Sequence, residues 1–380
     1  MTRGKLMAAA LYLGTLGLVG TASPPAAGAV AAEDCTYRIS VLEFDNPLPR
    51  PPGGRWFSGF GQILGSDGVN RFAGWRHWSV TSPWSFGSVG VIWTGATEQH
   101  LEGTAAEPWA TAFDVNGSGD AVGNLNASGA GDHAVLWRAG APATPVRLAE
   151  PAGATSTTAT AVDDNGVIVG FATFGSGTGQ TTRGLTWSVS SPGTVRDLGA
   201  TAGVLSDVGA DGRVVGFTGR ADAPGRAVAG PVTAVTPLPG QPGTTGGYAF
   251  ATAGPFVVGR GAGTGPLRWE NGVAQALPAL APGPNNFSSD PIPPAPAFPV
   301  AVNSAGLVVA NTGHLPLDRL AGGIARASYL KDGEWRALPL DPEDVDLYGS
   351  NRAVTVTEDG RIGGTSSAAD LERPAIWTCT

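Results

Sequence analysis

The hydrophobic positions of this chain fall into short runs separated by polar turns, and this pattern repeats along most of the sequence. In "ATAVDDNGVIVG" (159–170), an apolar run, a turn containing Asp, Asn and Gly, and a second apolar run follow one another directly. Short β-branched runs bounded by Asn-Gly or Asp-Gly are typical of strands joined in tight hairpins. No segment shows the period of an amphipathic helix. The pattern therefore predicts an all-β protein.

The turn glycine recurs at intervals of 49, 49, 46, 42, 52 and 54 residues, at Gly68, Gly117, Gly166, Gly212, Gly254, Gly306 and Gly360. An apolar strand with a bulky residue near its end follows most of these turns, at Trp93, Trp137, Trp187, Trp269, Leu330 and Trp377. A leucine comes a few residues later, at Leu101, Leu148, Leu198, Leu277 and Leu338. The fourth copy has "AVAGPV" (227–232) where the tryptophan strand belongs, although Leu238 keeps its place. A period near 49 residues indicates a repeat architecture.

Each copy reads as four short strands in two hairpins, which is typical of a β-propeller blade. A β-solenoid is the alternative, but its rungs are usually far shorter. The sequence therefore predicts one propeller domain over residues 32–380 with seven four-stranded blades. Their expected ranges are 55–104, 105–150, 155–200, 201–240, 246–279, 298–340 and 346–377, the last completed by 36–44.

The two ends of the chain have matching deficits. The last copy stops shortly after Trp377 without a leucine strand, and "CTYRISVLEF" (35–44) reads as a leucine strand without a partner. We therefore expect residues 36–44 to pair beside 372–377 and to close the ring, which leaves no unpaired blade. Cys35 and Cys379 are the only cysteines, and both fall where the last blade lacks its turn. The sequence predicts a disulfide between them.

In such blades the turns between strands one and two and between strands three and four share one face, here called the turn face. The opposite connection face carries the turns between strands two and three and the connections between blades, which vary in length and are expected to hold the function. Indole rings suit stacking against sugars or docking of a protein. The alternative is that the indoles fold the loops onto the rim and are buried. The candidate ligand-binding residues, all expected in connection-face loops, are Trp56, Trp75, Trp78, Trp84 and Trp109.

The first residues predict export. Arg3 and Lys5 precede a short apolar run and small residues, which is the order of a secretory signal peptide over residues 1–31. A membrane anchor is disfavoured because the run is shorter than the roughly 20 residues that span a bilayer. The acidic approach to Cys35 disfavours a lipoprotein. We expect a secreted monomer without a membrane span, in a compartment where disulfides persist.

The charge balance argues against nucleic acid as a partner. The chain has 23 Lys and Arg against 31 Asp and Glu, a net charge of −8, and no basic cluster compensates locally. A glycan or an extracellular protein fits better as the expected partner.

The repeat also resembles a known family. "ATAVDDNGVIVG" (159–170), followed by "LTW" (185–187) and "RDLGA" (196–200), is similar to the HAF-type extracellular repeat of secreted bacterial proteins. The opening "YRISVLEF" (37–44) also resembles the first strand of such proteins. The resemblance implies an extracellular location and a repeated β-structure, and it implies no activity.

Catalytic and metal motifs are missing, so we expect no catalytic residues, no metal and no cofactor. The histidines do not form His-Glu-x-x-His, and no Gly-x-Ser-x-Gly is present. The acids Asp163, Asp164, Asp211 and Asp359 are interpreted as turn formers. "DVNGSGD" (114–120) spaces oxygen ligands as a calcium loop would, but it lacks the closing acid. Carboxylates paired across blades for glycoside hydrolysis and a scaffold without a small ligand remain the alternatives to a binding module.

Overall fold

The computed structural model describes residues 36–42, 56–81, 84–127, 131–219, 224–240, 247–261, 265–278, 297–313, 325–342, 350–368 and 371–380. Two short helical elements lie wholly within these ranges, the single 3-10 turns η2 (Gly177–Gly179) and η3 (Ala200–Ala202). Within these ranges no helix has the length and apolarity needed to cross a membrane. The predicted leader, residues 1–31, and the candidate connections 45–55 and 281–296 lie outside the described residues.

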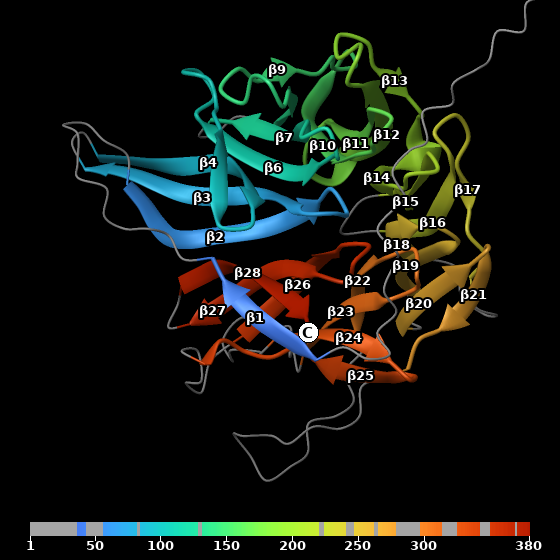
Figure 1. The fold of residues 1–380 in the computed structure, drawn as a ribbon. Coiled ribbons are helices and arrows are strands. Elements are labelled where there is room, and N and C mark those ends of the chain that lie inside the picture. Colours follow the sequence, from blue (N-terminus) through green and yellow to red (C-terminus); the bar gives the residue numbers. More distant parts are fainter. Residues whose placement is uncertain are drawn as a thin grey trace, which may run out of the picture.

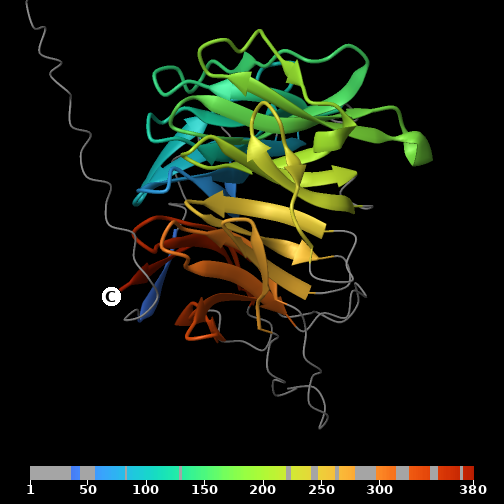
Figure 2. The ribbon, with the colours of Figure 1, turned by 90° about the vertical axis from the view of Figure 1, so that its right-hand side faces the viewer.

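Seven antiparallel sheets of four strands surround a common axis, which confirms the predicted propeller and its blade count. Figure 2 shows the strands of successive blades side by side, from green through yellow to red. The first three blades are β2 (Trp56–Ser66), β3 (Arg71–Thr81), β4 (Trp84–Thr94) and β5 (Thr97–Leu101); β6 (Trp109–Val115), β7 (Ala121–Asn126), β8 (His133–Trp137) and β9 (Val146–Arg147); and β10 (Ala154–Val162), β11 (Val167–Phe174), β12 (Thr181–Ser188) and β13 (Arg196–Asp197).

The remaining blades repeat this order. They are β14 (Val204–Val208), β15 (Arg213–Gly219), β16 (Pro224–Pro231) and β17 (Thr236–Pro237); β18 (Gly247–Ala253), β19 (Phe256–Gly261), β20 (Gly265–Glu270) and β21 (Val273–Ala276); β22 (Phe298–Val302), β23 (Val308–Gly313), β24 (Ala325–Lys331) and β25 (Glu334–Ala337); and β26 (Ser350–Val356), β27 (Ile362–Ala368), β28 (Leu371–Cys379) and β1 (Tyr37–Val41). The first strand of each blade is the innermost, because consecutive first strands contact one another around the ring, β2 with β26 included.

The seventh blade joins the two ends of the chain, as predicted. β1 pairs with β28 in antiparallel register, from Tyr37 opposite Cys379 to Val41 opposite Ala375. In Figure 1 the blue β1 lies beside the red β28. The backbone N–H of Thr380 also donates to the carbonyl of Thr36 at 3.0 Å. No cysteine among the described residues is free, but Cys35 lies outside them, so its pairing with Cys379 stays a prediction.

In four blades the buried tryptophan of the third strand also holds the connection that enters its blade. The indole N–H of Trp137 donates to the carbonyl of Glu102, just after Leu101 of the preceding blade, at 2.9 Å. The same bond to a residue directly after the preceding blade's leucine recurs from Trp187 to Ala149, from Trp269 to Pro239 and from Trp377 to Pro339. These tryptophans are therefore scaffold, as expected.

Blade six makes the same bond by another route. Its third strand has Leu330 at the tryptophan position, and Trp335 of β25 lies directly opposite Leu330. The indole of Trp335 donates to the carbonyl of Pro278 at 2.8 Å, again just after the preceding blade's leucine. A tryptophan on the fourth strand therefore supplies the bond that the third strand lacks.

The glycine that ends most second-strand motifs also has a packing reason. A Cβ built on Gly170 would stand 2.0 Å from the carbonyl oxygen of Thr158 on β10. β10 makes a bulge between Ala159 and Ala161 that brings its backbone against β11. Equivalent clashes, all below 2.1 Å, would occur at Gly74, Gly123, Gly216, Gly259 and Gly364.

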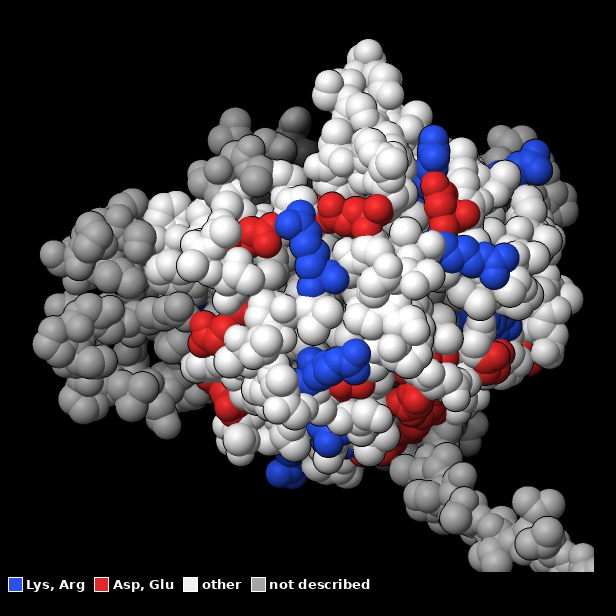
Figure 3. All heavy atoms as spheres, turned by 90° about the horizontal axis from the view of Figure 1, so that it is seen from above, with Lys and Arg blue, Asp and Glu red and all other residues white. Residues whose placement is uncertain are grey.

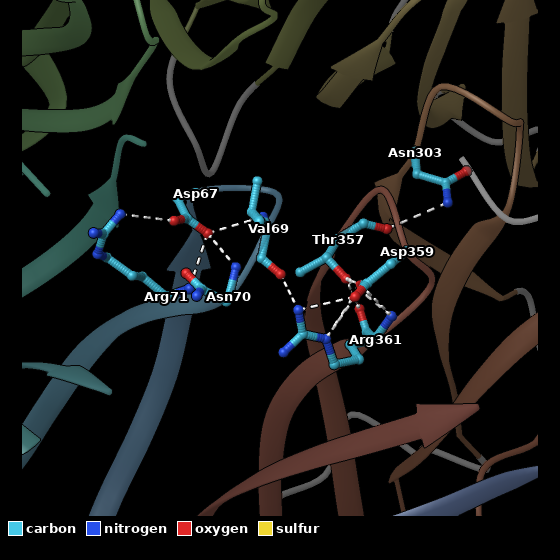
Figure 4. Close-up of polar contacts among 8 residues, drawn as sticks. All are labelled: Asp67, Val69, Asn70, Arg71, Asn303, Thr357, Asp359 and Arg361. Atoms are coloured by element: carbon cyan, nitrogen blue, oxygen red, sulfur yellow. Dashed lines mark hydrogen bonds and ion pairs between the residues drawn. The ribbon is translucent and has the colours of Figure 1, made fainter. Parts of the chain in front are cut away.

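The acids of the repeat form turns on the turn face, as interpreted from the sequence. Figure 4 shows two of these turns: Asp67 accepts backbone N–H groups of Val69, Asn70 and Arg71, and the hydroxyl of Thr357 accepts that of Arg361. Arg361 also donates to the carbonyl of Val69, which links blade seven to blade one.

The other turn acids behave in the same way. Asp163, Asp211 and Asp359 accept backbone N–H groups of their own turns, and Asp164 accepts one from Gly117 of the preceding blade. The acids of the turn face thus form structural hydrogen bonds, within turns and between neighbouring blades.

Candidate functional site

The first blade is built differently from the others. Its strands β2, β3 and β4 are each 11 residues long. β3 pairs with β4 along its whole length, from Arg71 opposite Thr94 to Thr81 opposite Trp84. Residues 75–81 and 84–88, where tryptophans were expected in loops, therefore lie in two long paired strands, which project from the ring in Figure 1. Their alternating apolar and polar residues around Ser82-Pro83 were the sequence signal for a hairpin.

The five candidate tryptophans consequently lie in strands rather than in loops. Trp56 and Trp109 begin β2 and β6, Trp75 and Trp78 lie on β3, and Trp84 begins β4. Trp78 is 7 % exposed and packs in the core of the first blade. Trp75 and Trp109 are half-buried, whereas the side chains of Trp56 and Trp84 lie outside the described part of the structure. Trp78 is thus buried, as in the alternative to ligand binding that the sequence left open.

Trp109 belongs to an aromatic row that the sequence did not reveal. Its ring stacks on Phe86 at 6.1 Å between centroids, and Phe86 stacks on His77 at 6.0 Å. Phe60 meets His77 edge to face at 6.5 Å. The exposed fractions of Phe60 and Phe86 are 38 % and 45 %. This aromatic row (Phe60, His77, Phe86 and Trp109) brings together β2, β3, β4 and β6.

A glycine fixes Trp109 against the hairpin. A Cβ built on Gly87 would lie 2.2 Å from Cδ1 of Trp109, so the indole rests directly on the backbone of β4. The indole N–H donates to the carbonyl of Phe86 at 2.9 Å. Because its polar group is satisfied internally, Trp109 presents its ring rather than its N–H.

The aromatic row is uncharged at neutral pH. Burial lowers the pKa of His77, so its ring is neutral there. Next to His77 along β3, the buried Arg76 pairs with Glu98, which also accepts the indole N–H of Trp93. The row therefore offers planar, apolar faces without a fixed charge.

A pair of carboxylates lies on the connection face of blade two. Glu107 and Glu150 come from successive blade connections, and both approach His133, at 3.5 and 2.7 Å. Arg147 lies within 3.8 Å of Glu107 and 3.6 Å of Glu150. Although burial opposes ionisation, hydrogen bonds from His133 and Thr157 lower the pKa of Glu150.

A glycosidase needs one carboxyl group that keeps its proton near neutral pH. Glu150 has the opposite tendency, because its surroundings favour the ionised form. Glu150 is therefore suited to holding two blade connections together through His133 rather than to donating a proton.

The oxygens of the "DVNGSGD" segment are also engaged by the protein itself. Asn116 accepts backbone N–H groups of Ser118 and Asp120, and Asp120 accepts that of Ala139. Asp114 points elsewhere and accepts the N–H of Val162 in blade three at 3.0 Å. This segment is thus a turn, in agreement with the preferred interpretation.

Charged side chains do not gather on the side of the molecule seen in Figure 3, where Lys and Arg are interspersed with Asp and Glu. Ion pairs between paired strands include that of Arg183 with Asp197, at 3.2 Å between side-chain nitrogen and oxygen. On this side the surface has no patch of a single sign.

No protein-family model matches this chain, and no curated protein matches it either. A puromycin-hydrolyzing peptidase of Mycobacterium tuberculosis has a similar fold, with a TM-score of 0.52 and 12 % identity over 86 % of this chain and 51 % of that one, so this chain spans about half its length. An oligogalacturonate lyase from Vibrio parahaemolyticus matches with a TM-score of 0.50 and 10 % identity over 90 % and 97 % of the two chains. At such identities the likeness shows the fold alone.

Proposed function

We propose that this protein is an extracellular binding module that recognises a polysaccharide through the aromatic row on its first blade. The observation that carries the proposal is the exposure of Phe60 and Phe86, at 38 % and 45 %, within a row of rings held by neighbouring strands. Large aromatic side chains left partly exposed on a rigid scaffold are typical of binding surfaces.

A sugar chain suits this surface better than a peptide of fixed charge. The rings are planar and neutral, and they follow one another at about 6 Å between centroids. The apolar faces of successive sugar rings stack on such a surface, while their hydroxyl groups stay in water. Because Trp109 is held by Gly87 and by its own hydrogen bond, its side chain loses little entropy on binding.

The extracellular location rests on the sequence. Residues 1–31 have the order of a signal peptide, and the repeat resembles the HAF-type extracellular repeat. A polysaccharide of a cell surface or matrix is a ligand that an exported protein meets.

Binding to an array of neutral and acidic glycans tests the proposal. The secreted protein is compared with Phe60→Ala and Phe86→Ala, and with Val273→Ala as a matched control. Val273 is 63 % exposed on β21 in blade five, so the control removes an exposed apolar side chain outside the first blade. We expect both phenylalanine variants to lose at least about tenfold in affinity, because truncating a central aromatic contact costs about 2 kcal/mol.

Two results would contradict the proposal. Equal glycan binding by all four proteins would remove the aromatic row from the site. Absence of binding to every glycan, together with capture of a surface protein that depends on Phe86, would show that the row docks a protein instead.

A further inference from the structure

Most arginines in the described part of the chain have an acceptor within the protein. A carboxylate lies within 4 Å of Arg71, Arg76, Arg147, Arg183, Arg268, Arg336, Arg361 and Arg373. Backbone carbonyls accept from Arg138, Arg196 and Arg213. Two arginines on the inner part of the connection face, Arg260 and Arg352, have no such acceptor among the described residues.

Arg260 is held between two aromatic rings. It lies near the end of β19, opposite Tyr248 of β18. Its guanidinium carbon is 5.5 Å from the ring centroid of Tyr248 and 5.1 Å from that of Phe298 on the next blade. A guanidinium stacked on ring faces keeps its N–H groups directed outward in its own plane. Arg260 is therefore held between two rings, and its N–H groups meet no acceptor among the described residues.

Arg352 lies on blade seven, two blades beyond Arg260. It is exposed between the buried Asn351 and Ala353 on the innermost strand β26. Asn311, which lies opposite Phe298, exchanges two hydrogen bonds with the backbone of Ala353, at 2.9 and 2.8 Å. This bridge ties β26, the strand of Arg352, to β23, the strand that pairs with the β22 strand of Phe298.

From this arrangement we propose a second binding site on the connection face, formed by Arg260, Arg352, Tyr248 and Phe298, which takes the carboxylate of an acidic sugar. A carboxylate accepts two parallel N–H bonds from a guanidinium, and such charge-assisted pairs are roughly twice as strong as neutral hydrogen bonds. The aromatic rings beside the guanidinium offer an apolar surface for the sugar ring that carries the carboxylate.

The charge of the whole protein is compatible with this ligand. The net charge is −8, but interactions between exposed charges are largely screened beyond about 8 Å at physiological ionic strength. A carboxylate that accepts hydrogen bonds from a guanidinium gains more from this contact than acids beyond the screening length oppose. A long, dense polyanion such as nucleic acid would still be repelled by the rest of the surface.

The second site also adjoins the first blade. The inner strands β26 and β2 are neighbours around the ring. Gln62 of β2, whose amide is held by Glu372, is two residues from Phe60 in the aromatic row. This inference rests on the binding function proposed above: the two sites together would define the ligand as an acidic polysaccharide. The arginine site itself needs no contact with the aromatic row.

The test uses free D-glucuronate and its methyl ester, which differ only in the carboxylate. Binding to the secreted protein is measured by calorimetry and by ligand-observed NMR, for wild type, Arg260→Gln and Arg352→Gln. Arg38→Gln is the matched control, because Arg38 is an exposed arginine of the outer strand β1 with the same change in charge. Thermal unfolding verifies that the variants fold. Because Arg352 is exposed, its replacement leaves the packing of the core intact.

We expect glucuronate to bind at least about tenfold more tightly than the ester, and Arg260→Gln and Arg352→Gln each to remove most of this preference. Arg38→Gln should keep it. Equal binding of acid and ester, or equal losses in Arg352→Gln and Arg38→Gln, would overturn the arginine site. Phe86→Ala separates the two proposals: glucuronate binding should survive in this variant, whereas glycan-array binding should not.

Discussion

Trp137 contacts its own blade and the preceding one at the same time. Its ring is fully buried between them, and its indole N–H donates to the carbonyl of Glu102 at 2.9 Å. Replacement by phenylalanine keeps a six-membered ring in the core but removes both the N–H group and the second ring. The change therefore measures how strongly a single indole holds two blades together.

The expected loss has two parts. A hydrogen bond of this kind contributes about 1 kcal/mol net to stability. The smaller side chain leaves a cavity of about 40 Å³, which at about 24 cal/mol per Å³ costs a further 1 kcal/mol or so. We therefore expect Trp137→Phe to lower the free energy of unfolding by about 2 kcal/mol. Trp335→Phe should lose the same hydrogen-bond contribution, although Trp335 lies on a fourth strand.

Urea unfolding followed by circular dichroism measures these differences without relying on tryptophan fluorescence. Trp75→Phe is the control, because it removes the same atoms at a half-buried position whose indole makes no hydrogen bond within the described residues. Its loss should stay below about 1 kcal/mol. If Trp137→Phe were no more destabilising than Trp75→Phe, the indole hydrogen bond would not be what joins the blades.

Two further predictions concern pH and the chain ends. Burial raises the pKa of Asp207 to about 6 from 3.8, so its contribution to stability is complete below pH 3.8 and is lost as pH rises through about 6. At about 1.4 kcal/mol per pKa unit, this lowers the free energy of unfolding by roughly 3 kcal/mol. In urea unfolding, Asp207→Asn should not show this fall between pH 4 and 7. If the variant and the wild type had the same pH profile, the prediction would be refuted. Cys35 and Cys379 should form a disulfide whose loss removes at most roughly 5–6 kcal/mol by loop entropy; two alkylated thiols by intact mass in the native, unreduced protein would refute the pairing.

The sequence determined the architecture because its signals are local and repeated. Turn glycines such as Gly166 and leucines such as Leu148 mark each blade. The blade count was therefore right although the fourth copy lacks its tryptophan. The exchange between Leu330 and Trp335 could not be foreseen, because it depends on which residues lie opposite each other on paired strands.

The candidate site was predicted less well. Trp109 was identified by its residue type, but its neighbours Phe60, His77 and Phe86 were not, because the hairpin that carries them was interpreted as a loop. Rows of rings from four strands arise from register and twist, which a single sequence does not display. The two arginines were missed for another reason. Arg260 and Arg352 stand out because, on the inner part of the connection face, neither has an acceptor among the described residues, and that is a property of the folded chain.

The pairing of β1 with β28 sets the order in which the protein can fold. Thr36 and Thr380, which meet at this seam, are 344 positions apart. Each doubling of loop length adds only about 0.6 kcal/mol to the entropic free energy of closing the loop, so the pairing of distant strands reduces stability little. Contacts between such distant segments nevertheless form slowly. Until β1 arrives, β28 is an open edge that pairs as readily with the β1 of another molecule. Dilute conditions therefore favour the closed ring, and a high concentration of unfolded chains favours exchanged dimers.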